Sequence, residues 1–220
     1  MTAPAPRPPV GLRVVSLDLD GTLIHPAIFN AVADALGFGD ALRPSFEAYL
    51  KGEMTIPEAF AHDFPYFVGR RVDELREVLR STDRWTPGIG EAVARFHDAG
   101  LKVIVTTDQP RFLAEATQEL FGVDELVCTE CSIVNGRVTA DVKPEFEKWP
   151  NLERWLRAKR VPPSAVAHVG NGSNDIPVFA RVGFSIAVNH EKEAVARAAR
   201  HAIPRLADLG EVADVLLPDA

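Results

Sequence analysis

The chain has 220 residues, of which 46% are hydrophobic and 25% are charged, a composition typical of soluble globular proteins. Its net charge of −7 argues against binding to nucleic acid or to an anionic membrane surface. No stretch has the length of a transmembrane helix, and the N-terminus lacks the apolar core of a signal peptide. We therefore expect a cytoplasmic protein without a membrane or nucleic-acid partner, and the sequence leaves monomer and homodimer both open.

The first predicted element is a short buried strand at residues 13–18, and the segment that follows it is helical. Helices are predicted at residues 27–36, 41–50, 56–64 and 72–79. About sixty residues of helix directly after a strand exceed an ordinary crossover connection. We expect a helical-bundle cap at residues 26–84, inserted into a core domain of residues 1–25 and 85–220. The alternative is that these helices are ordinary extensions packed on the sheet.

Downstream, apolar strands alternate with amphipathic helices. Strands are predicted at residues 102–107, 126–129, 165–170, 183–188 and 201–203, and helices at residues 90–99, 111–121, 152–159, 175–181, 192–199 and 206–216. This alternation is typical of an α/β fold, a Rossmann-like parallel sheet with crossover helices. Residues 133–138 carry Asn135-Gly136 between apolar residues, which predicts a β-hairpin.

Asp18 and Asp20 stand two residues apart where the first strand ends. Side chains alternate along a strand, so the two carboxylates point in roughly the same direction. Carboxylates so close repel each other unless a cation lies between them or one of them is protonated. The pair therefore suits a metal site in which one aspartate attacks and the other transfers a proton. The alternative is a strand end whose Asp-Leu-Asp-Gly sequence only forms a turn.

Other predicted strands also end in polar residues. The second strand ends in Thr106, Thr107 and Asp108, and Asn171, Asn174 and Asp175 follow the strand at residues 165–170. The carboxyl ends of parallel strands share one edge of a sheet, so these residues converge on one cleft. Lys148 is the expected cation of this cleft, and Lys143, which precedes a proline, is the other candidate.

In their order and spacing these motifs resemble those of haloacid dehalogenase (HAD) superfamily phosphatases, and within them the phosphoserine phosphatase branch with a helical cap. The resemblance extends from about residue 14 almost to the C-terminus. It rests on Asp18-Leu19-Asp20-Gly21-Thr22, Thr106, Lys148 and Gly170-Asn171-Gly172-Ser173-Asn174-Asp175.

The resemblance implies a Mg²⁺-dependent phosphatase that hydrolyses a small phosphorylated metabolite through an aspartyl-phosphate. Asp18 is then the nucleophile, Asp20 the general acid and base, and Lys148 the cation that balances charge. The expected phosphate contacts are Gly21, Thr22, Thr106, Thr107, Lys148 and Asn174. The expected Mg²⁺ ligands are Asp18, Asp20, Asn171 and Asp175.

The chain departs from the family pattern at the metal site. Asn171 stands where the family usually has an aspartate, and an amide oxygen binds magnesium less strongly than a carboxylate. We expect an enzyme with weakened metal binding. The alternatives are a catalytically impaired phosphate-binding or regulatory protein, or a phosphotransferase whose acceptor is not water.

A second departure concerns substrate recognition. The Glu that meets the phosphoserine amine falls on Ala27, and the Arg that meets its carboxylate falls near His62 or Asp63. Phosphoserine is therefore not our first choice of substrate. Other cap cations that could face the cleft are Arg43, Lys51, Arg70 and Arg71, although surface positions are more usual for such residues.

Cys128 and Cys131 form a C-x-x-C pair. No second pair completes a zinc site, and the pair falls in a predicted extended segment rather than at a helix N-terminus. We expect both cysteines to be structural.

Overall fold

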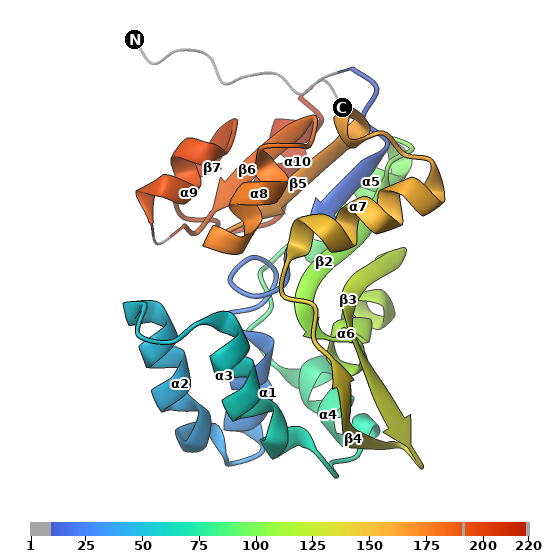
Figure 1. Cartoon of the computed structure of the whole chain (residues 1–220). Helices are drawn as coiled ribbons and strands as arrows, with labels where there is room; N and C mark the ends of the chain where they lie inside the picture. Colours follow the sequence, from blue (N-terminus) through green and yellow to red (C-terminus); the bar gives the residue numbers. More distant parts are fainter. Residues whose placement is uncertain (1–9, 191, 219–220) are drawn as a thin grey trace.

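The computed structural model of the chain describes residues 10–190 and 192–218 (Figure 1). Its centre is a seven-stranded sheet of order β4-β3-β2-β1-β5-β6-β7. The strands are β1 (Val14–Leu17), β2 (Lys102–Pro110), β3 (Glu125–Val134), β4 (Arg137–Lys143), β5 (Val166–Gly170), β6 (Phe184–Val188) and β7 (His201–Ile203). All neighbours are parallel except β3 and β4, which form an antiparallel hairpin. The predicted Rossmann-like α/β fold is confirmed.

Helices cover both faces of the sheet. They are α5 (Ile89–Asp98), α6 (Arg111–Phe121), α7 (Lys148–Lys159), α8 (Ile176–Phe179), α9 (Glu193–Ala198) and α10 (Gly210–Leu216). Val14 packs in one hydrophobic cluster with Leu152 of α7, whereas Val15 packs in another with Phe96 of α5. Successive residues of a strand face opposite sides of a sheet, so β1 is buried on both faces.

The central strand β1 is the point at which the chain changes direction across the sheet. From β1 the chain builds β2, β3 and β4 on one side, and it later builds β5, β6 and β7 on the other. Leu17 is in register with Val105 of β2 and Val169 of β5, so the carboxyl ends of these three strands meet. Ligands of open α/β sheets bind at such a switch point.

The helical segment after β1 forms the predicted helices. They are α1 (Ile28–Ala35), α2 (Gly39–Lys51), α3 (Ile56–Asp63) and α4 (Val72–Ser81), with a 3-10 turn at Phe64–Phe67. Figure 1 shows α1, α2 and α3 grouped beyond the carboxyl ends of the sheet strands. The rings of Phe29 and Phe67 stack at 4.4 Å within this group. The domain limits at residues 26 and 84 stay a prediction.

The fourth helix of this segment is tied to the core. Arg80 of α4 forms an ion pair of 2.8 Å with Glu119 of α6, and Arg76 pairs with the same glutamate at 2.9 Å. The backbone of the β3–β4 hairpin also bonds the segment before α4, since Val138 N donates to Arg70 O at 3.0 Å. Helix α4 therefore links the cap to the core, whereas α1 to α3 stand over the sheet edge.

Some boundaries differ from those predicted. Helix α7 begins at Lys148 rather than residue 152, because Pro150 lies in the first turn, where a missing N–H costs no helical hydrogen bond. Strand β2 continues to Pro110 rather than ending at residue 107. The predicted helix at residues 175–181 is a 3-10 turn, Ser173–Asp175, followed by the short α8. Across the described part of the chain, the helices are too short or too polar to span a bilayer.

Candidate active site

A cleft lies between the carboxyl edge of the sheet and the cap helices α1 to α3. Its core wall contains five of the predicted site residues: Asp18, Asp20, Lys148, Asn171 and Asn174. They come from the ends of β1 and β5 and from the first turn of α7. Residues separated by up to 156 positions along the chain are thus brought together by the parallel sheet, as the strand ends predicted.

Lys148 is the buried cation of the cleft. Its Nζ lies 2.6 Å from Asp18 Oδ1 and 2.7 Å from Asp175 Oδ1, and the lysine is 3% exposed. Burial alone would lower the pKa of Lys148, but the Asp175 and Asp18 carboxylates outweigh it and raise the pKa above its usual value. The ammonium is therefore fixed and charged. Lys143, the other candidate, is exposed on β4.

Asp175 anchors this cation and the loop after β5. Its Oδ1 accepts from Lys148 and lies 3.0 Å from His168 Nε2, while its Oδ2 accepts from the backbone N–H groups of Asn171 and Gly172. Burial opposes ionisation of this carboxyl, but Lys148 and His168 hold its pKa below the usual range. Both oxygens are engaged by the protein and the side chain is fully buried. This placement differs from the predicted role of Asp175 as a metal ligand.

Asp18 is buried at the end of β1 and 4% exposed. Burial and the neighbouring Asp175 carboxylate raise the pKa of Asp18 well above its usual value, against the lowering effect of Lys148. A carboxylate that acts as a nucleophile must be ionised. Further positive charge beside Asp18 would therefore favour its reactive form.

Asp20 is held by two donors. Ile28 N donates to its Oδ1 at 2.7 Å, and Gln109 Nε2 donates to its Oδ2 at 2.5 Å. Burial, and next the Asp108 carboxylate, raise the pKa of Asp20 to about 7. A carboxyl group with such a pKa gains and loses a proton readily near neutral pH, which is what a general acid and base requires.

Gly21 and Asn171 fit closely against each other. Gly21 has φ +72°, and a Cβ built there would lie 1.9 Å from Asn171 Nδ2. A side chain at position 21 would therefore be strained by the backbone and would displace the Asn171 amide. Gly21 shapes the loop rather than lining the cleft.

The three threonines predicted as phosphate contacts do not line the described cleft. The Thr106 hydroxyl pairs with Ser16 Oγ at 2.8 Å, and Thr107 Oγ1 accepts from Gln109 N at 3.2 Å. Thr22 is fully buried, and its hydroxyl has no partner among the described residues. Thr22, Thr106 and Thr107 stand apart from the described residues that line the cleft. Because β2 runs on to Pro110, the residues that reach the cleft from this strand come later.

Those residues are Asp108, which the sequence placed at the strand end without a role in the site, and Gln109, which sequence reasoning missed. Asn174 Nδ2 donates to Asp108 Oδ2 at 3.3 Å, and burial raises the pKa of this carboxyl. The available signal was the Thr-Thr-Asp-Gln sequence, which continues the polar strand end by two residues. A third carboxylate thus faces the cleft beside Asp18 and Asp20.

The candidate cap cations are not at the cleft. Arg43 pairs with Asp40 at 2.7 Å and Arg71 with Asp73 at 2.6 Å on exposed surfaces. The Arg70 guanidinium lies 4.0 Å from the centre of the Phe38 ring, and Lys51 is exposed. None of these four side chains lines the described cleft.

The oxygen donors at the ends of β1 and β5 fit a Mg²⁺ ion. Mg²⁺ prefers oxygen ligands and retains several waters. The Asp18 carboxylate, the backbone carbonyl of Asp20 and the side-chain oxygen of Asn171 would hold it, since all three are oxygen donors at the carboxyl edge of the sheet. In the described part of the chain no three His, Cys, Asp or Glu side chains form a metal cluster by themselves. A metal here would therefore need backbone, amide and water oxygens in addition to the Asp18 carboxylate.

The family follows from comparison with known proteins. A sequence profile described as haloacid dehalogenase-like hydrolase matches residues 15–180. The chain belongs to this family. The match covers β1, the cap segment, β2, Lys148 and the loop after β5, so the predicted resemblance is confirmed.

Curated relatives of this HAD-like chain carry the name phosphoserine phosphatase. The protein of Archaeoglobus fulgidus is 30% identical over 181 residues, covering 80% of this chain and 52% of the relative. The chain thus spans about half the length of that relative. The protein of Albidiferax ferrireducens is 26% identical over 200 residues, covering 86% of this chain and 84% of the relative.

Solved structures share the fold. A HAD family hydrolase from Salmonella enterica serovar Typhi superposes with a TM-score of 0.82 at 17% identity, over 96% of this chain and 74% of that chain. A phospho-aspartyl intermediate analogue of phosphoserine phosphatase superposes with a TM-score of 0.75 at 20% identity, over 91% of this chain and 97% of the other. At this identity the likeness supports the HAD fold.

Proposed function

We propose that this protein is a Mg²⁺-dependent phosphatase of the phosphoserine phosphatase type that hydrolyses a small phosphate monoester through an aspartyl-phosphate on Asp18. The observation that carries the proposal is the Asp18–Lys148 pair of 2.6 Å at the sheet's switch point, with Asp20 two residues further on. The names of the relatives support a phosphatase over a silent binding protein or a phosphotransferase.

In the first step an Asp18 carboxylate oxygen attacks phosphorus in line with the ester oxygen, and the P–O bond to the alcohol breaks. Asp20, in its protonated form, gives its proton to the departing alkoxide. Its partner Gln109 holds the carboxyl in place through Oδ2. In the second step Asp20 takes a proton from water, which then attacks the aspartyl-phosphate and releases phosphate.

Charge on the phosphoryl oxygens is balanced by Lys148, which Asp175 fixes at 2.7 Å. Most of the catalysis of phosphoryl transfer comes from such prearranged positive charge. Mg²⁺ held by Asp18, Asp20 and Asn171 would supply the remaining positive charge when bound. Asn174, which donates to Asp108 and lines the cleft, is a candidate phosphate contact.

The test is hydrolysis of p-nitrophenyl phosphate with Mg²⁺ and with excess chelator. We expect Mg²⁺-dependent release of phosphate that Asp18→Asn reduces by at least about 10³-fold, since it removes the nucleophile. Asp98→Asn, which removes an exposed aspartate of α5, is the matched control and should keep wild-type activity. Full activity of Asp18→Asn would contradict the proposal.

A further inference from the structure

The cap wall of the cleft is apolar and aromatic. Phe29, Phe46, Leu50, Ile56 and Phe60 line it. The rings of Phe29 and Phe60 lie 5.9 Å apart, and both residues are buried. Apolar surface of a ligand that is buried against this wall makes the free energy of binding more favourable.

One charged group stands in this wall. Among the cap residues that the structure describes, Asp63 is the charged side chain that lines the cleft. It is 8% exposed and ends helix α3. Ser45 Oγ of α2 donates to Asp63 Oδ1 at 2.6 Å, and His62 Nδ1 lies 2.7 Å from the same oxygen. These contacts fix the carboxylate through one of its two oxygens.

The wall thus selects by charge as well as by polarity. A nearly buried carboxylate is stabilised by a cation and strongly repels a second carboxylate. Aromatic faces, here Phe29 and Phe60, also attract ammonium groups. A ligand with a positive charge on an apolar body satisfies both features of the wall.

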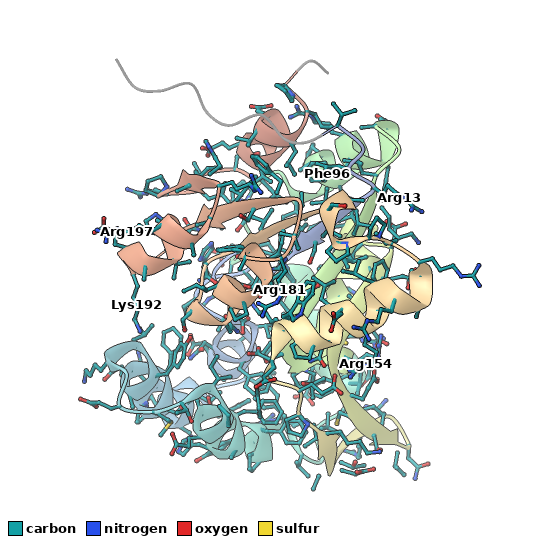
Figure 2. The ribbon with its side chains drawn as sticks, turned by 45° about the horizontal axis from the view of Figure 1, so that its top comes forward. Arg13, Phe96, Arg154, Arg181, Lys192 and Arg197 are labelled. Atoms are coloured by element: carbon teal, nitrogen blue, oxygen red, sulfur yellow. The ribbon has the colours of Figure 1, made fainter. Side chains whose placement is uncertain are left out.

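The cation at the rim does not reverse this preference. Lys192, at the start of α9, extends from the core toward the cap helices (Figure 2). Its side chain is exposed to solvent. An ion pair with an exposed lysine contributes little net free energy, so Lys192 selects weakly for a carboxylate.

We propose that the substrate is a phosphate monoester whose alcohol half is apolar and carries an ammonium group that binds Asp63. The inference rests on the proposed phosphatase function and names the substrate class of the same cleft. An amino acid such as phosphoserine, which places a carboxylate beside its amine, is disfavoured.

The test uses three aryl phosphates that share one phenolate leaving group. They are the phosphate esters of tyramine, of 4-ethylphenol and of 3-(4-hydroxyphenyl)propanoic acid, which end in an ammonium group, in no charge and in a carboxylate. All assays run at one pH, about 8, where the amine of the tyramine ester is protonated. We expect kcat/KM for the tyramine ester to exceed that for the uncharged ester by about tenfold, with the carboxylate ester lowest.

Asp63→Asn should reduce the tyramine-to-ethylphenol ratio to about one, since it keeps the side-chain shape and removes the charge. The ratio compares two substrates on one preparation, so a loss of folded protein cancels. Asp40→Asn removes an exposed carboxylate of α2 and is the matched control, in which the ratio should persist.

A tyramine-to-ethylphenol ratio of kcat/KM near one in the wild type would overturn the inference and leave the phosphatase function intact. A preference for the carboxylate ester that Lys192→Ala abolishes would do the same. Hydrolysis of p-nitrophenyl phosphate but of none of the three esters would overturn the inference alone. Absence of p-nitrophenyl phosphate hydrolysis, or hydrolysis unaffected by Asp18→Asn, would overturn the phosphatase function and the inference together.

Discussion

At the scale of single residues, Lys148 determines the charge balance of the cleft. It is buried between Asp18 and Asp175, within 2.7 Å of each. A buried ion pair adds little to stability as a whole, but removing one partner leaves the other charges unpaired in a medium of low dielectric constant. We therefore expect the lysine to matter for folding and, in the proposed function, for phosphate binding.

Lys148→Met should lower the free energy of unfolding by about 3–5 kcal/mol and should remove phosphatase activity, because Asp18 and Asp175 lose their common partner. Urea unfolding and p-nitrophenyl phosphate assays measure the two effects. Lys143→Met is the control, since that lysine is exposed, and should resemble the wild type. Equal behaviour of the two variants would show that Lys148 is not the cation of the site.

Gly21 offers a second residue-scale prediction. Gly21→Ala combines a left-handed backbone with a contact to Asn171, whereas Gly37→Ala, at φ +78°, meets open space. Backbone strain costs about 1–2 kcal/mol at either position. We expect Gly21→Ala to be the more destabilising of the two in urea unfolding, and it alone should lower activity, because it displaces the Asn171 amide. Equal losses in both variants would refute this account of Gly21.

At the scale of elements, strand β3 is joined to its neighbours by Glu125. Its carboxylate contacts Lys159 Nζ at 2.6 Å, Lys102 Nζ at 3.0 Å and Trp155 Nε1 at 3.0 Å. Burial opposes ionisation, but these three partners lower the pKa of Glu125 to about 2. The side chain therefore connects β2, β3 and α7 through its charged form.

Glu125→Gln tests this connection. The folded pKa is below the usual value of 4.5, so the contribution of Glu125 is complete above that pH and disappears as the pH falls toward about 2. We expect the free energy of unfolding of the wild type to exceed that of Glu125→Gln by about 1 kcal/mol at neutral pH, after allowance for partial exposure. This difference should shrink below about pH 4.5. Glu153→Gln, with one exposed partner at 3.1 Å, should show little effect in the same pH-dependent urea series. A difference that grows in acid would contradict the assignment.

Elements were more predictable than the side chains at their ends. The alternation of strands and helices predicted the parallel sheet, because a strand buried on both faces has an unmistakably apolar sequence, as at Val103-Ile104-Val105. The polarity of the last residues of β2 did not show which of them face the cleft. Thr106 and Thr107 are buried within the strand end, and only the continuation of the ladder to Pro110 brings Asp108 and Gln109 to the cleft.

The same limit applies to charged partners. Asp18, Asp20 and Lys148 could be predicted because the motif order and the sheet edge converge on them. Asp63 lies on a cap helix, and its position in the cleft depends on how α3 packs against α2 through Ser45. The family resemblance places a substrate-binding position of the cap near His62 or Asp63, but only this packing shows that Asp63 is the one that lines the cleft.

At the scale of the whole molecule, two walls of different character enclose one cleft. The core wall holds carboxylates and Lys148 at the switch point of the sheet, and the cap wall holds phenylalanines and Asp63. Helices α1 to α3 supply the cap residues of the cleft, so in the proposed function their sequence sets the alcohol half of the substrate. In the proposed function the core wall carries out phosphoryl transfer and the cap wall selects the alcohol half of the substrate.

The most direct measurement is a crystal structure of the protein with Mg²⁺ and trifluoroberyllate, which mimics a phosphoryl group on a carboxylate. We predict beryllium bonded to an Asp18 carboxylate oxygen, with Lys148 against the fluorides. Trifluoroberyllate bound to Asp108 or Asp20, or an Asp18 carboxylate free of it at saturating concentration, would contradict the account.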